Sequence, residues 1–67
     1  MKQELIDLLE EIRKFGHQAA HTFTLDLAHD DMDADQWERL QDVLKEINIK
    51  SQEAFLLSAN LRRNISA

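Results

Sequence analysis

The chain has 67 residues, with eight lysines and arginines against thirteen aspartates and glutamates, and a formal net charge of −5 with its histidines neutral. It contains one glycine, no proline and no cysteine. This composition excludes disulfide bonds, cysteine nucleophiles and cysteine-ligated zinc, and it disfavours a loop-rich β-sandwich, whose turns draw on glycine and proline. The length allows a single domain, residues 1–67, and we expect it to be all-α.

The first expected helix covers about residues 3–29. Apolar side chains recur there every three or four residues, which is the spacing of one helix face. The segment Arg13–Gly16 combines basic residues with a glycine, a pattern typical of a helix end, so a break near Gly16 is the alternative. The residues of this helix that are assigned to the core or to a dimer contact are Leu5, Leu9, Ile12, Phe15, Ala19 and Phe23.

A turn is expected at residues 30–33. Asp33 is followed three positions later by Gln36, which is the spacing of a capping box. In that motif each side chain accepts a hydrogen bond from the backbone N–H of the other residue. The sequence therefore predicts that a second helix begins at about residue 34.

The second expected helix covers about residues 34–65. A break near Asn48, which would give a three-helix bundle, is the alternative to one continuous helix. The face assigned to the core or to a dimer contact contains Trp37, Leu40, Leu44, Ile47, Phe55 and Leu61.

Together these elements predict a long antiparallel helical hairpin. A chain of this length buries only about 60% of the surface that its unfolded form exposes, and two helices shield only part of each apolar face. We therefore expect a homodimer, in which two hairpins form a four-helix bundle.

Two further groups of residues predict a surface for another protein. One group lies to the side of the second helix's assigned face, and the other is the acidic turn, which suits a basic partner. Burial of the apolar residues within the bundle, and simple solvation of the acidic ones, are the alternatives. The apolar-side group is Ile49, Gln52, Leu56, Leu57 and Asn60, and the acidic group is Asp30, Asp31, Asp33 and Asp35.

Other kinds of chemistry have little support in the sequence. His17 and His21 have the i, i+4 spacing of two metal ligands, but two ligands do not make a site, so they are weak candidates and no cofactor is expected. No glycine-rich phosphate loop or nucleophile pattern is present, and we expect no enzyme activity. The acidic pI of about 4.9 disfavours nucleic-acid binding, although Lys2, Arg62 and Arg63 could form one basic patch.

The expected location and function follow from these features. The first residues include acids where a signal peptide would be apolar, and no run approaches the roughly 18 apolar residues of a membrane span, so we expect a cytoplasmic protein without a membrane contact. The predicted function is that of a small non-enzymatic regulatory or adaptor protein that binds another protein, as an inhibitor, antiactivator or chaperone. The alternatives are a metal-responsive protein that uses His17 and His21 and a small nucleic-acid-binding regulator.

Overall fold

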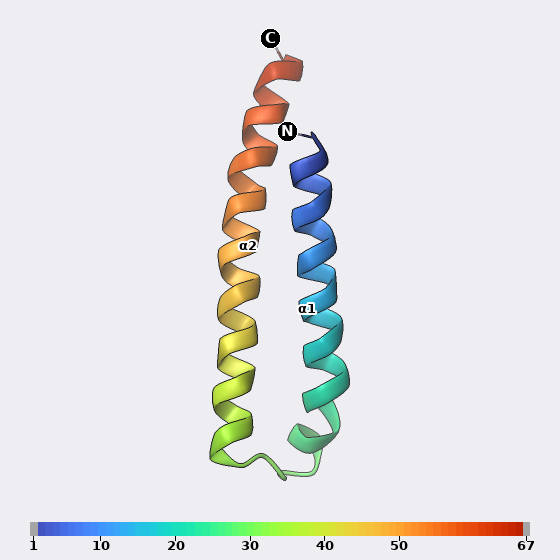
Figure 1. The fold of residues 1–67 in the computed structure, drawn as a ribbon, viewed down its shortest axis with the longest axis vertical. Coiled ribbons are helices and arrows are strands. Elements are labelled where there is room, and N and C mark those ends of the chain that lie inside the picture. The colour runs from blue at the N-terminus through green and yellow to red at the C-terminus, as the bar shows by residue number, and fades with distance from the viewer. Residues whose placement is uncertain (1, 67) are drawn as a thin grey trace.

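The protein is a hairpin of two long helices. The structure is a computed structural model that describes the backbone of residues 2–66 and the side chains of residues 2–64. Helix α1 (Lys2–Ala28) and helix α2 (Ala34–Ser66) lie side by side in opposite directions (Figure 1). The predicted all-α hairpin is confirmed, with both helices and the turn close to their expected bounds.

Neither helix is broken where the alternatives placed a break. Helix α1 continues through Gly16 and α2 continues through Asn48, so the three-helix alternative is wrong. A glycine inside a helix costs about 0.5–1 kcal/mol relative to alanine. Apolar residues that contact the other helix continue beyond Gly16 to Ala19 and Phe23, and their packing outweighs that cost.

The side chains between the two helices follow an alternating spacing of three and four residues. This is the period of helices that pack with a small crossing angle. Among residues 2–64 only Phe23 and Ala54 are buried, with 5% and 7% of their surface exposed. The inward-facing residues, all buried or half-buried, are Leu5, Leu8, Ile12, Phe15, Ala19, Phe23 and Asp26 of α1 and Gln36, Leu40, Val43, Ile47, Lys50, Ala54, Leu57 and Leu61 of α2.

The hairpin itself covers part of the face that was predicted to lie in the core or at a dimer contact. In α2, Leu40, Ile47 and Leu61 face α1 as expected, but Trp37, Leu44 and Phe55 are exposed, and so is Leu9 of α1. Val43, Lys50 and Leu57 occupy the inward positions instead. Leu57, expected on the partner-binding surface, is therefore half-buried in the hairpin. The cause is that each helix has two adjacent apolar rows, which the spacing of apolar residues alone does not rank.

The turn begins with a helix end that lacks the usual glycine. The backbone N–H of Asp31 donates to the carbonyl of Asp26 at 2.8 Å, and that of Asp30 donates to the carbonyl of Leu27 at 3.3 Å. These two bonds form a Schellman motif, whose left-handed position most often holds glycine. Here Asp30 holds it with a φ of 55°, a conformation that aspartate tolerates better than most residues.

The predicted capping box at the start of α2 is confirmed. The backbone N–H of Gln36 donates to Oδ1 of Asp33 at 2.8 Å, and the backbone N–H of Asp33 donates to Oε1 of Gln36 at 3.1 Å. The side chain of Gln36 has a second role, because its Nε2 donates to Oδ2 of Asp26 at 2.6 Å. Gln36 thus takes part in the capping box at the start of α2 and also hydrogen-bonds α2 to the last turns of α1.

A second polar link joins the helices further from the turn. Nζ of Lys50, at an inward-facing position, lies 2.7 Å from Oε2 of Glu11. The hydrogen bond to Glu11 raises the pKa of the Lys50 ammonium above its usual 10.5. The links at Gln36–Asp26 and Lys50–Glu11 both favour the observed register of the two helices.

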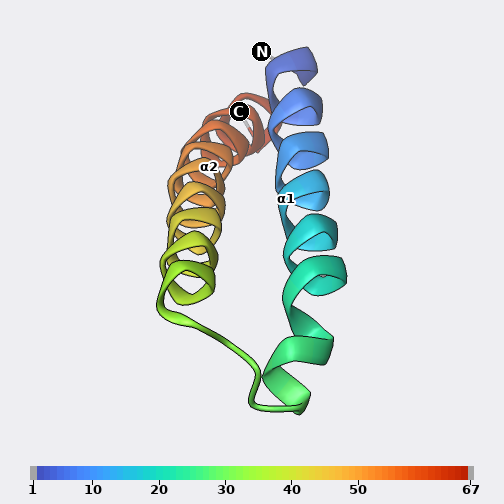
Figure 2. The same cartoon turned by 60° about the horizontal axis from the view of Figure 1, so that its bottom comes forward.

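The hairpin is long and exposes a large area for its mass. Its extents are 52 × 16 × 15 Å and its radius of gyration is 15.5 Å, against about 11 Å for a compact domain of this length. The accessible surface is 5523 Å², whereas a globular protein of 7.8 kDa exposes about 4,400 Å². Within residues 2–66 no third element covers either side of the pair (Figures 1 and 2).

Candidate protein-binding surfaces

Helix geometry divides the exposed surface of the hairpin into two faces. In an antiparallel pair of helices, each residue that comes one position after an inward-facing residue in the sequence lies on one side of the hairpin. Each residue that comes one position before an inward-facing residue lies on the opposite side. Two clefts agree with this division. Leu27 and Trp37, which each follow an inward-facing residue, line one cleft. Gln18 and Arg39, which lie on the preceding side, line another.

One side, which we call the apolar face, carries most of the exposed large apolar side chains. Of the nine such residues in the described range 2–64, six lie here: Ile6, Leu9, Leu27, Trp37, Leu44 and Phe55. Between Lys2 and Arg62 its helical positions contain no acidic residue. The whole face consists of Lys2, Ile6, Leu9, Arg13, Gly16, Ala20, Thr24 and Leu27 of α1 and Trp37, Gln41, Leu44, Asn48, Ser51, Phe55, Ser58 and Arg62 of α2.

The opposite side, which we call the polar face, concentrates acidic residues. Seven acids lie on it: Glu4, Asp7, Glu11, Asp35, Asp42, Glu46 and Glu53. Leu25, Ile49 and Leu56 are the other three exposed large apolar residues, and they are separated by these charges. The two sides therefore differ in charge and in apolar content. The net negative charge of the chain is concentrated on the polar face and is not spread evenly over the surface.

The residues expected to bind a partner are divided by the structure. Ile49, Leu56 and Asn60 are exposed on the polar face. Gln52 is also exposed and lines a shallow apolar cleft on the outer side of α2 with Ser51, Phe55 and Leu56. Leu57 is separated from this group because it turns toward α1. The cleft continues the predicted surface toward Phe55, which was predicted to lie in the core or at a dimer contact.

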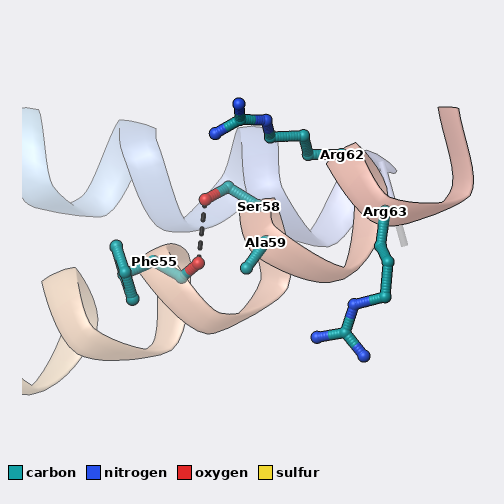
Figure 3. Close-up of a pocket in the computed structure, with 5 residues that line it drawn as sticks. All are labelled: Phe55, Ser58, Ala59, Arg62 and Arg63. Carbon is teal, nitrogen blue, oxygen red and sulfur yellow. Dashed lines mark hydrogen bonds between the residues drawn. The ribbon is translucent and has the colours of Figure 1, made fainter. Parts of the chain in front are cut away.

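The two ends of the hairpin carry different charges. Asp30, Asp31, Asp33 and Asp35 are all exposed at the turn, where Asp30, Asp31 and Asp33 also hold the helix ends through the bonds described above. At the other end, Arg62 extends over Ser58 toward α1, whereas Arg63 points away from it (Figure 3). Ser58 donates its hydroxyl hydrogen to the carbonyl oxygen of Phe55 at 2.8 Å. The two guanidinium groups do not converge on one point.

The two histidines lie on the exposed outer side of α1. The rings of His17 and His21 are stacked, with their centres 6.4 Å apart and their planes at 12°. In the described part of the chain no group of three or more His, Cys, Asp or Glu side chains could hold a metal ion. The pair thus offers two possible ligands, as the sequence indicated, and the structure brings no third one to it.

Sequence reasoning missed the apolar face as a continuous surface. Ile6 and Leu27 belong to none of the groups predicted from the sequence, whereas Leu9, Trp37, Leu44 and Phe55 were grouped with residues that face the other helix. The signal that separates the faces is the placement of acids, which are absent from the positions that follow inward-facing residues and frequent at those that precede them. This signal is present in the sequence once the inward positions are known.

Comparisons of this chain with protein-family models, curated proteins and solved structures found no match. Within residues 2–66, neither helix has a stretch that is both long and apolar enough to cross a membrane.

Proposed function

We propose that this chain is a non-enzymatic adaptor that acts by protein–protein binding and works as a homodimer. The observation that carries the proposal is the set of large apolar side chains left exposed by the hairpin, in which Phe23 and Ala54 are the only fully buried residues of those whose side chains the structure describes. Contiguous apolar patches on a small protein mark interaction surfaces. A helix with an exposed apolar row is a common recognition element for another polypeptide.

Self-association is the first part of this function to test. The molar mass measured by light scattering on a sizing column should be twice 7.8 kDa at micromolar concentration. The free energy of unfolding should also rise with protein concentration, because association stabilises the folded chain by mass action. A mass of one chain at all concentrations up to the millimolar range would contradict the homodimer.

The second part is binding of a different protein near Leu56. Ile49 and Leu56 are exposed among Glu46 and Glu53, so the complementary partner has apolar side chains flanked by basic ones. Binding such a segment would let the dimer mask or hold a region of its partner, as a regulator or chaperone does.

Matched variants test this surface. Leu56→Asp places a charge at its centre, and Leu25→Asp places the same charge on the polar face near the turn. Immobilised wild type and Leu25→Asp should retain the same protein from an extract of the source cells, and Leu56→Asp should lose it while keeping its helical circular dichroism. Equal retention by all three chains would contradict the assignment, whatever proteins are retained.

A further inference from the structure

We propose that a second copy of this chain covers the apolar face in an antiparallel orientation, with Gly16 and Ser51 close to the two-fold axis. The inference rests on the proposed homodimer and specifies its interface. Such an interface is isologous, so each residue pair occurs twice. It places the turn of each hairpin beside the open end of the other.

The area left exposed matches what a second copy would cover. The hairpin exposes 5523 Å², about 1,100 Å² more than a globular protein of the same mass. A stable protein interface of standard size buries about 800 Å² on each partner. Covering the apolar face would therefore bring the chain close to the exposure of a compact protein.

Charge selects this face and this orientation. The apolar face carries Lys2 and Arg62 at the open end and is continuous with the exposed aspartates, such as Asp30, at the turn. An antiparallel copy sets these bases against the partner's acidic turn, whereas a parallel copy sets acid against acid and base against base. Pairing through the polar face would bring its acidic residues into contact with one another.

Side-chain size along the face also fits a second hairpin. The large residues Leu27 and Trp37 lie near the turn, and Leu9 and Phe55 lie near the open end. Between them α1 has the small residues Gly16, Ala20 and Thr24, and α2 has Ser51 together with the larger Leu44. A two-fold axis at the centre lays the large residues of one copy against the opposite end of the other, and the small residues let the helices approach closely.

Gly16 is the residue that the hairpin alone does not explain. A Cβ added to Gly16 would meet nothing within 4 Å, so packing against α2 does not require a glycine there. Glycine nevertheless weakens the middle of a helix. A neighbouring helix that approaches the apolar face at this position accounts for it.

Two pairs of variants test the interface. Leu44 is on the apolar face and Leu25 is on the polar face, with 51% and 68% of their surfaces exposed. Leu44→Asp should weaken dimerisation about 100-fold or more, because the buried charge occurs twice, while Leu25→Asp leaves the dimer intact. Gly16→Leu should weaken it about tenfold or more, and His17→Leu, one residue away on the outer side, should not. Both apolar-face variants should keep their helicity, and an unchanged dissociation constant in either would overturn the interface.

Cross-linking tests the orientation, and the absence of native cysteine makes single-cysteine variants specific. With a short bis-maleimide, a mixture of Ile6→Cys and Leu27→Cys chains should form a covalent heterodimer, and Ile6→Cys alone should not cross-link. Efficient cross-linking of Ile6→Cys alone would show a parallel dimer and overturn the inference while the proposed homodimer stands. A chain that is monomeric by light scattering would remove both.

Discussion

Replacing Phe23 by alanine tests how much of the fold depends on one side chain. Only 5% of its surface is exposed, and a buried phenylalanine removes about 150–250 Å² from water. At about 25 cal/mol per Å² this is about 4–6 kcal/mol, and measured losses for Phe→Ala in cores are about 3–5 kcal/mol. Alanine's better helix propensity returns about 0.5 kcal/mol. The expected loss is about 3–4 kcal/mol.

The assay is urea unfolding followed by far-UV circular dichroism, with all chains at equal concentration. A chain of this length has a total stability of about 3–10 kcal/mol, so Phe23→Ala should remove a third or more of it. Leu25→Ala is the control, because Leu25 lies two residues away on the same helix with 68% of its surface exposed; it should change the stability by less than about 0.5 kcal/mol. Equal effects of the two substitutions would refute the packing described for α1.

Three further predictions concern the turn and the links between the helices. Asp30→Gly should raise the free energy of unfolding by about 0.5–1 kcal/mol, because glycine removes the strain of the left-handed position; no gain in urea unfolding would contradict the Schellman motif. Gln36→Glu keeps the capping acceptor but replaces the donor to Asp26 by a carboxylate, so it should lower stability by about 1–2 kcal/mol, whereas a capping role alone predicts no loss. Because the pKa of Lys50 is raised in the folded chain, its contribution is present below its usual 10.5 and is lost as the pH rises through the higher folded value. Unfolding at a series of alkaline pH values should therefore show a decline that both Lys50→Gln and Glu11→Gln reduce, and an equal decline in all three chains would argue against the ion pair.

Particular residues show how far the sequence specifies this molecule. The capping box at Asp33 and Gln36 was predictable because its two bonds form between residues three positions apart. The continuity of α1 through Gly16 was harder, since the local signal for a helix end competes with packing that only the partner helix supplies. The inward position of Lys50 could not be derived locally, because its stability there depends on Glu11, 39 positions earlier in the chain.

The candidate surfaces were predictable only in part, for a related reason. Ile49 and Leu56 were recognised as displaced from the inward face, and they are exposed. Trp37, Leu44 and Phe55 were assigned to a single face with Leu40 and Ile47, although neighbouring positions on a helix differ in direction by about 100°. A choice between adjacent apolar rows depends on which residues the other helix offers, and that is a property of the pair.

The polar links are distributed unevenly along the hairpin, and this has a consequence for its motions. The Schellman motif, the capping box and the Gln36–Asp26 bond all lie within the turn and the adjoining helix ends, while the Lys50–Glu11 ion pair lies nearer the open end. Folding should start at the turn, where the contacts are most local, and amide hydrogen exchange should be slowest there and fastest near both termini. In an antiparallel dimer, the slowly exchanging end of each chain would lie against the fraying end of the other. Amide hydrogen exchange would then be more uniform along the length of the dimer than along a single hairpin.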